Sequence, residues 1–274
     1  MFGMIFRGMA VGMTETVPGI SGSTVAMILG IYERLVYSLS ILTSKNRKEA
    51  YPFLLTFGAG MAGGFAFSIF IIDYLLTAFR TPTLMFFVGI IVGFLPYLWI
   101  ETLKQAKNKL HIRHYLIMLL LLSIVVVGQS LSGMIQFDLN NLSVADYLFF
   151  IIAGFIASIA LVLPGISGAL ILTILGLYEI ATASLMSFNF PIILAIGSGI
   201  VLGVLLTSKF IRYLLSNYTA ETYAAMIGLV SGSIYAILNN LDSIFSTSTI
   251  VGSLLTFLAG IAFIITLNKT KNKF

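Results

Sequence analysis

The sequence predicts an all-α integral membrane protein built from two inverted-topology repeats. Three observations lead to this prediction: the composition, a set of long apolar segments, and a duplicated motif. The chain of 274 residues is 59% hydrophobic and only 9% charged, with a mean hydropathy of +1.06. Soluble domains carry roughly a quarter charged residues, so this chain has too little charge to cover a water-facing surface. It also has no cysteine, which excludes disulfides, thiolate metal sites and thiol nucleophiles.

Six apolar segments are long enough to cross a bilayer, because a spanning helix needs about 20 mostly apolar residues. They cover residues 51–79, 82–100, 114–131, 191–216, 221–239 and 250–268. Two further apolar regions, 1–42 and 147–188, are too long for one span, and the motif Pro-Gly-Ile-Ser-Gly interrupts each of them. We therefore expect each of these two regions to form a re-entrant, broken helical hairpin.

The two interrupted regions are copies of each other. The segment "GMAVGMTETVPGISGSTVAMILGIYE" (8–33) aligns with "GFIASIALVLPGISGALILTILGLYE" (154–179) at an offset of 146 positions. A second match, at an offset of 139, aligns "GAGMAGG" (58–64) with "GSGIVLG" (197–203). Two constant offsets in one chain predict two homologous halves, each with one broken hairpin and three spans.

The charge distribution indicates that the second half, 144–274, is inverted relative to the first, 1–137. If each hairpin enters and leaves the membrane on one side, most basic residues fall on that side. They are Lys45, Arg47, Lys48, Lys104, Lys107, Lys109, Arg113, Lys209, Arg212, Lys269, Lys271 and Lys273. Asp138, Asp146 and Asp242 then fall on the other side, where Arg80 is the only basic residue. Because cytoplasmic loops carry an excess of Lys and Arg, we expect both termini to be cytoplasmic.

Glycine-rich faces on two of the spans are expected to allow close helix packing. The residues are Gly58, Gly60 and Gly64 in the first half and Gly197, Gly199 and Gly203 in the second.

Each Pro-Gly-Ile-Ser-Gly break should present polar groups inside the membrane. A non-helical break at this depth persists only where it is buried in protein or lines a watery cavity. Ser21, Ser23 and Thr24 are suitable N-cap residues for a helix over about 24–36. Unpaired amides and hydroxyls that lead into a positive helix end favour an anion, phosphate above all. The candidate binding residues are Pro18, Gly19, Ser21, Gly22, Ser23, Thr24, Pro164, Gly165, Ser167 and Gly168.

The breaks have a second interpretation, in which they are tight turns that only pack and whose hydroxyls bond to neighbouring carbonyls. We favour binding, because two inverted copies that meet near a pseudo-twofold axis would make one site. Discontinuous helices that meet in this way form the substrate sites of many transporters.

The pattern Gly-x-x-x-Gly…Glu-x-x-Pro-Gly-Ile-Ser-Gly-Ser-Thr…Leu-Gly-x-Tyr-Glu over residues 8–33, with a weaker echo over 154–179, resembles the bacterial polyprenyl-phosphate transporter family called PopT. The resemblance covers essentially the whole chain. It implies a translocase in the bacterial cell membrane that returns undecaprenyl phosphate from the outer to the cytoplasmic leaflet for reuse in cell-wall synthesis. The chain departs from the family pattern at Glu15, where Asp is more common, and at Ser23, where a second glycine is more common.

Three glutamates are candidates for ion coupling or charge compensation. Glu15 lies three residues before the first break, where an unpaired carboxylate would cost about 3 kcal/mol. It is either a proton carrier or cation partner, or a cap on a neighbouring helix end. Glu33 and Glu179 are expected near the ends of the helices that follow the breaks, where a carboxylate opposes the helix dipole. This suggests a fixed basic partner or, for Glu33, a surface pair with Arg34. The coupling ion could be a proton or sodium.

A phosphate headgroup needs cationic partners, and Arg80 and Arg212 are the candidates beside apolar segments. Arginine suits bidentate phosphate contact. Arg80 lies where a headgroup would first be captured from the outer leaflet, and Asp73 could pair with it. Snorkelling of the side chain to the interface is the alternative for both arginines.

Several other kinds of site are excluded or disfavoured. A Gly-x-Ser-Gly string also occurs in intramembrane serine proteases, but these need a membrane-embedded histidine. The only histidines, His111 and His114, lie in a basic loop. The sequence has no metal-ligand cluster, Walker loop or dinucleotide fingerprint, so we expect no metal, no cofactor, no nucleic-acid partner and no enzyme activity. A secondary transporter of a small soluble anion and an enzyme acting on lipid phosphates are the alternatives to a lipid-phosphate translocase.

Overall fold

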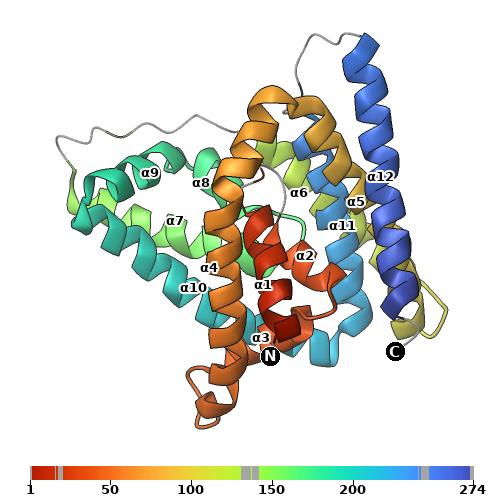
Figure 1. Ribbon diagram of the computed structural model, residues 1–274. Coiled ribbons are helices and arrows are strands. Elements are labelled where there is room, and N and C mark those ends of the chain that lie inside the picture. Colours follow the sequence, from red (N-terminus) through yellow and green to blue (C-terminus); the bar gives the residue numbers. More distant parts are fainter. Residues whose placement is uncertain are drawn as a thin grey trace.

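The computed structural model describes residues 2–15, 17, 21–130, 137, 142–239, 241 and 247–271, and within these ranges the regular elements are all α-helices. Figure 1 shows their arrangement. The first half contains α1 (Phe2–Thr14), α2 (Gly22–Ile28), α3 (Tyr32–Ile41), α4 (Arg47–Ala78), α5 (Arg80–Gln105) and α6 (Ile112–Ser130). The second half contains α7 (Val144–Val162), α8 (Gly168–Ile174), α9 (Tyr178–Ser187), α10 (Phe190–Asn217), α11 (Thr219–Leu238) and α12 (Thr247–Lys271).

Seven of the described helices are long and apolar enough to span a membrane: α4, α5, α6, α7, α10, α11 and α12. Six of them correspond to the predicted spans, with ends shifted by a few residues. The seventh, α7, belongs to the region predicted as the second hairpin, and its 19 residues exceed the 13 of its counterpart α1. The protein is therefore a multi-pass helical membrane protein.

The segment after each break is divided into two short helices. The prediction of one helix over about 24–36 is wrong, because α2 ends at Ile28 and α3 begins at Tyr32. Gly30 lies between them with a φ of +69°, and Gly176 lies between α8 and α9 with a φ of +71°. Glycine adopts this left-handed conformation without strain, so the chain can turn at the same place in both halves.

Helices α1 and α4 pack closely in the first half, and α7 and α10 pack in the same way in the second. A Cβ atom added to Gly60 would lie 2.2 Å from the carbonyl oxygen of Ile5. One added to Gly199 would lie 2.0 Å from the carbonyl oxygen of Ile151. Such short distances show that backbones touch where a side chain could not fit, so glycine is required on α4 and α10.

The glycine prediction is correct for four residues and wrong for two. Gly64 and Gly203 also meet the backbone of the neighbouring helix, as Gly60 and Gly199 do. A Cβ atom on Gly58 or Gly197 would have no other atom within 4 Å. These two glycines face away from the helix interface and have no packing role in it.

The last helix of each half packs on the middle helix of the other half. Helix α12 lies along α5, and α6 lies along α11. Between α12 and α5, a Cβ atom on Gly89 would lie 2.1 Å from the carbonyl oxygen of Phe257. Between α6 and α11, a Cβ atom on Gly228 would lie 2.3 Å from the carbonyl oxygen of Met118. The two halves are therefore interlocked rather than placed side by side.

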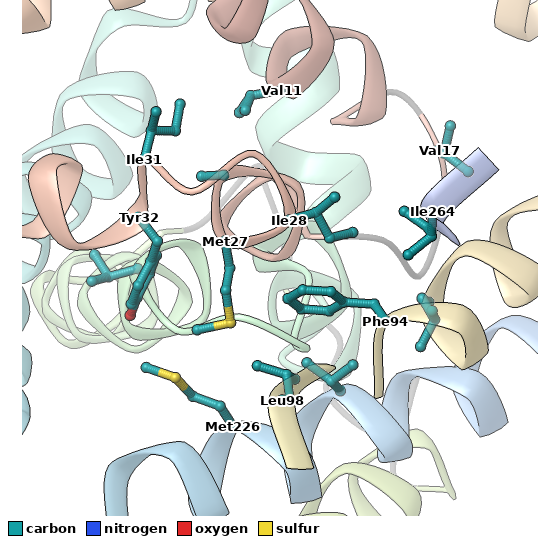
Figure 2. Close-up of a cluster of buried hydrophobic side chains, with 14 of the residues drawn as sticks. Val11, Val17, Met27, Ile28, Ile31, Tyr32, Phe94, Leu98, Met226 and Ile264 are labelled. Atoms are coloured by element: carbon teal, nitrogen blue, oxygen red, sulfur yellow. The ribbon is translucent and has the colours of Figure 1, made fainter. Parts of the chain in front are cut away.

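The short helix α2 is held inside the hydrophobic core. Figure 2 shows Met27 and Ile28 of α2 beside Phe94 and Leu98 of α5, with Met226 of α11 close by. All five side chains are buried. This packing fixes the first break against helices from both halves.

The start of α1 and the end of α12 lie at the same end of the molecule, together with the α3–α4 turn, the α5–α6 connection and the α10–α11 corner (Figure 1). The α4–α5 corner and the start of α12 lie at the opposite end. Helix α4 therefore runs away from the end with the termini, and α10 runs toward it.

Candidate functional site

The two interrupted regions meet through hydrogen bonds between the halves. The Ser23 hydroxyl donates to the carbonyl oxygen of Leu163 at 2.9 Å, and the Gly165 N–H donates to Thr24 Oγ1 at 2.8 Å. Pro18 and Gly19 lie outside the described residues. The expectation that the broken segments come together is thus confirmed for the part of each break that the structure describes.

The hydroxyls at the breaks have different surroundings. Ser23 donates to a carbonyl oxygen of the second break, as the packing interpretation predicts, whereas Thr24 accepts a hydrogen bond from an amide there. Ser21 and Ser167 are the N-cap residues of α2 and α8, but neither side chain caps its helix. The Ser21 hydroxyl instead bonds to that of Ser23. Since Ser21 and Ser167 are buried, any substrate that reaches them must do so after the surrounding helices move.

The second break passes very close to α11. Gly165 has a φ of +97°, and a Cβ atom there would lie 2.4 Å from both the carbonyl carbon of Leu229 and the amide nitrogen of Val230. Pro164 and Gly168 are buried beside it. Glycine is therefore needed at 165 both for its backbone conformation and for the close approach.

The Glu15 side chain links the two helices on either side of the first break through a hydrogen bond. Its Oε1 atom accepts a hydrogen bond from the Gly22 N–H at 3.1 Å, which joins the end of α1 to the start of α2. A Cβ atom on Gly22 would lie 2.1 Å from that oxygen. In the second half Leu161 occupies the position of Glu15, beside Gly168. The capping role considered for Glu15 is present, and only the first half has a carboxylate here.

Replacing Thr24 with valine is expected to lower the thermal stability of the purified protein, because the buried Gly165 N–H would lose its acceptor. An unsatisfied buried donor costs about 1–3 kcal/mol. Thr24→Ser keeps the hydroxyl and serves as the control, with a melting temperature close to that of the wild type. Equal melting temperatures for the valine and serine variants would contradict a role for this hydrogen bond.

The prediction for Glu33 and Glu179 is wrong about their position in the helices. Both lie in the first turn of a helix, α3 and α9 respectively, where a carboxylate is favoured by the helix dipole. Glu33 accepts a hydrogen bond from the Tyr223 hydroxyl at 3.0 Å, and the Arg34 guanidinium lies 4.9 Å from the Phe53 ring centroid. A basic partner is therefore not needed to explain either glutamate.

Arg212 joins α10 to α3. Its Nη1 atom donates to Ser40 Oγ at 3.3 Å, and its guanidinium lies 4.5 Å from the centroid of the Tyr37 ring. Arg80 is at the opposite end of the molecule, at the α4–α5 corner (Figure 1). The two candidate phosphate partners are not brought together, and the contacts of Arg212 favour an anchoring role.

A cavity of about 940 Å³ lies between α1, α4, α5 and α12. Its walls are mainly apolar and include Ile71, Leu75, Phe86 and Phe263. Most of its polar residues lie where α4 meets α5 and in the first three turns of α12, with Thr14 of α1 apart from them: Arg80, Thr81, Thr83, Ser248, Thr249 and Thr256. The arrangement places a guanidinium and several hydroxyls at one end of an apolar groove.

Sequence reasoning found Arg80 but missed the hydroxyls around it. Two signals were present: Thr81 and Thr83 directly follow Arg80, and the run Thr-Ser-Thr opens α12 at 247–249. Neither run of hydroxyl residues predicts a site by itself. The two runs line one cavity because α12 packs on α5. The Asp73 side chain, predicted to pair with Arg80, lies outside the described residues.

A smaller cavity of about 130 Å³ continues the groove inward. It shares Ala10, Thr14, Phe87 and Phe263 with the larger cavity, and it reaches Thr24 at the first break. The arginine corner, the apolar groove and the broken helix therefore lie along one path.

The chain is similar to one family model and to two curated relatives over most of its length. A family model described as VCA0040-like, undecaprenyl phosphate translocase-like, matches residues 11–254. The polyprenyl-phosphate transporter of Staphylococcus aureus (strain NCTC 8325 / PS 47) is 32% identical over 251 residues, which cover 87% of each chain. That of Vibrio cholerae serotype O1 (strain ATCC 39315 / El Tor Inaba N16961) is 30% identical over 241 residues, which cover 83% of this chain and 74% of the relative. No solved structure is significantly similar to the chain. Because both the family model and the relatives match over most of the chain, the protein belongs to the undecaprenyl phosphate translocase-like family.

Proposed function

We propose that this protein is a translocase that carries polyprenyl phosphate from the outer to the cytoplasmic leaflet of the bacterial cell membrane. The observation that carries the proposal is the cavity of about 940 Å³ with Arg80 and hydroxyls at one end and apolar walls along the rest. A polyprenyl phosphate has the same two-part chemistry, a dianionic headgroup on a hydrocarbon chain. Its transport is also what the names of the two relatives describe.

The headgroup is held at the α4–α5 corner. Arg80 offers paired N–H donors for two phosphate oxygens, and Thr81, Thr83 and Ser248 line the same cavity. The first isoprene units follow the apolar groove, whose volume is in the range of about 300–1,000 Å³ typical of small-molecule sites. The remaining hydrocarbon stays in the bilayer.

The two halves, 1–137 and 144–274, form inverted repeats in this proposal, with both termini cytoplasmic. The matching glycine contacts of α1 with α4 and of α7 with α10 support a repeat. The opposite directions of α4 and α10 support inversion (Figure 1). The positive-inside rule then gives the Arg80 corner the outer side, since the basic α3–α4 and α5–α6 connections lie at the other end.

The breaks form the middle of the route. The smaller cavity leads from the groove to Thr24, and Ser21 and Ser167 lie beyond it. When the helices move, amides and hydroxyls of both breaks replace the contacts of the phosphate with Arg80. Discontinuous helices at the junction of two repeats serve transporters in this way.

Glu15 compensates charge during transport, through a proton or a sodium ion. Glu15→Gln keeps an oxygen acceptor for the Gly22 N–H but removes the charge. We expect a folded protein that no longer responds to an imposed proton or sodium gradient in proteoliposomes. Glu179→Gln, at an exposed position, is the control and should respond as the wild type does. A Glu15→Gln protein with an unchanged gradient response would reduce Glu15 to a helix cap.

The proposal is tested in proteoliposomes that contain a short-chain polyprenyl phosphate and an external phosphatase that cannot cross the membrane. With the protein, the phosphatase is expected to hydrolyse the lipid of both leaflets, and without it only that of the outer leaflet. Unchanged accessibility would overturn the proposal. Uptake of radiolabelled inorganic phosphate or carboxylates would instead indicate a transporter of small anions. Release of phosphate without the phosphatase would indicate an enzyme.

A further inference from the structure

A second cavity, of about 500 Å³, lies at the end of the molecule that holds the termini. The α5–α6 connection forms one wall, and the α10–α11 corner forms the other. Its lining is more polar than that of the first cavity, and it includes three cations, Lys107, Lys109 and Arg113, and one carboxylate, Glu221. None of the residues proposed above to bind the headgroup lines this cavity.

The second cavity occupies the position in the second half that the first cavity occupies in the first. Its lining residues correspond to those of the first at the offset of 139 that relates the spans: Tyr218 to Phe79, Ala220 to Thr81, and Arg113 to Gly252. Each cavity is therefore built from one helix corner and from the start of the last helix of the opposite half.

The two corners have the same local structure. Phe79 ends α4 with φ −140° and ψ 46°, and Tyr218 ends α10 with φ −134° and ψ 48°. Each ring makes a T-shaped contact with the aromatic residue five positions earlier, Tyr74 or Tyr213, at centroid distances of 6.5 and 6.1 Å. The correspondence thus extends from the sequence offset to backbone angles and side-chain contacts.

A buried polar atom without a hydrogen-bond partner lies at equivalent positions beside the two cavities. These atoms are Nε2 of His114, which is 1% exposed, and Oγ of Ser253, which is 8% exposed. His114 Nδ1 lies 2.9 Å from the His111 amide nitrogen and 3.2 Å from the His111 carbonyl oxygen, so this ring nitrogen is satisfied within its own turn and Nε2 is the one left without a partner. The Glu221 Oε1 atom is 3.9 Å from Nε2, too far for a hydrogen bond. His114 lines the second cavity, so a group bound there can take Nε2 as its hydrogen-bond partner.

The cation comes from a different wall in each cavity. In the first cavity the cation is Arg80, and the residue at the equivalent position of the second cavity is Thr219. In the second cavity the cations are Lys107 and Lys109 of the α5–α6 connection and Arg113 of α6. Glu221 is the one carboxylate in the lining, and it lies 2.9 Å from Arg113. The excess of positive charge favours a dianion. The polar walls suit a headgroup but not a hydrocarbon tail.

We infer that the second cavity is the cytoplasmic counterpart of the first and receives the phosphate headgroup of polyprenyl phosphate before its release. The inference rests on the proposed function. In the described conformation the groove beside Arg80 is large and mainly apolar, and the second cavity is smaller and more polar. When the repeats exchange access, the phosphate passes from Arg80 to Lys107 and Lys109.

The chain has no cysteine, so single cysteines report on each cavity without background. Phe79→Cys and Tyr218→Cys are a matched pair, since the native side chains are 54% and 49% exposed and line equivalent corners. Each variant in proteoliposomes is treated with a membrane-impermeant maleimide on the side that its cavity faces. Short-chain polyprenyl phosphate is expected to slow labelling of both. Thr43→Cys, in the exposed α3–α4 turn, is the control and should label at the same rate with or without the lipid.

The outcomes separate the inference from the proposed function. Protection of Phe79→Cys without protection of Tyr218→Cys would overturn the inference and leave the proposed function standing. Protection of neither would count against both. Protection of Tyr218→Cys by inorganic phosphate but not by the lipid would overturn the inference in favour of a soluble anion. If either cysteine prevents folding, the exposed pair Ala78→Cys and Asn217→Cys lines the same two corners and replaces it.

A double variant tests the basic residues. Lys107→Asn with Lys109→Gln should weaken protection of Tyr218→Cys by at least about tenfold, because each lost charge-assisted hydrogen bond is worth about 10- to 100-fold, and leave protection of Phe79→Cys unchanged. Asparagine is chosen because Lys107 has a φ of +52°, which asparagine tolerates. Lys104→Gln removes a nearby charge that is paired with Glu101 and does not line the cavity, and is the matched control. If Lys104→Gln weakens protection of Tyr218→Cys by the same factor, the effect comes from the net charge of this region, and the assignment of the two lysines is overturned.

Discussion

Replacing Arg80 with glutamine is expected to lower polyprenyl-phosphate transport by about 10- to 100-fold, because a hydrogen bond to a charged group contributes about 1.5–3 kcal/mol. Arg80 is the charged residue in the lining of the large cavity, where it lies among hydroxyls and apolar walls. Glutamine keeps a hydrogen-bonding side chain but has neither the charge nor the paired donors. The phosphatase-accessibility assay in proteoliposomes measures the rate.

Two further substitutions show whether the effect belongs to this site. Arg80→Lys keeps the charge but loses the planar guanidinium with its paired N–H donors, so an intermediate transport rate is expected. Arg212→Gln removes an arginine whose contacts are with Ser40 and Tyr37, outside the cavity, and should lower stability rather than headgroup binding. Wild-type transport by a folded Arg80→Gln protein would show that the phosphate enters elsewhere.

Gly60→Ala is expected to destabilise the protein strongly, while Gly58→Ala, two residues away on the same helix, is expected to stabilise it slightly. A Cβ atom at 60 would lie 2.2 Å from the Ile5 carbonyl oxygen, and backbone cannot move aside as a flexible side chain can. Overpacking costs about 1–3 kcal/mol and can cost more where two helices must separate. At 58 the Cβ atom meets nothing, so the better helix propensity of alanine, about 1 kcal/mol, remains.

Thermal unfolding in detergent measures both substitutions, and the second half provides an internal repeat of the experiment. Gly199→Ala should behave as Gly60→Ala does, because its Cβ atom would lie 2.0 Å from the Ile151 carbonyl oxygen. Gly197→Ala should behave as Gly58→Ala does. Similar melting temperatures for the 58 and 60 variants would contradict the close approach of α1 and α4.

The spans could be predicted because their signal is local, and the division into two copied halves stays a prediction from the repeated motif. Twenty apolar residues identify a membrane helix whatever surrounds it, and a repeated motif needs no knowledge of packing. Gly30 and Gly176 are different. Each lies inside an apolar stretch that reads as one helix, and only the backbone shows that the chain takes a left-handed conformation there. That missed turn also explains the error at Glu33 and Glu179, which begin helices rather than end them.

The candidate site was predictable only in part, because much of it is assembled from distant segments. The pairing of Ser23 with Leu163 and of Thr24 with Gly165 joins residues 140 and 141 positions apart. The hydroxyls near Arg80 come from α5 and from α12, which meet because glycines let these two helices touch. The sequence named Arg80 as a candidate, whereas the apolar groove beside it is a property of the packing of α1, α4, α5 and α12.

The interlocking of α6 with α11 and of α12 with α5 determines which segments enclose the large cavity. The wall that α12 contributes to this cavity comes from the second half of the chain, and its other walls come from the first half. Residues 1–137 alone would therefore leave the cavity open on one side, so the cavity exists only where both halves are folded together.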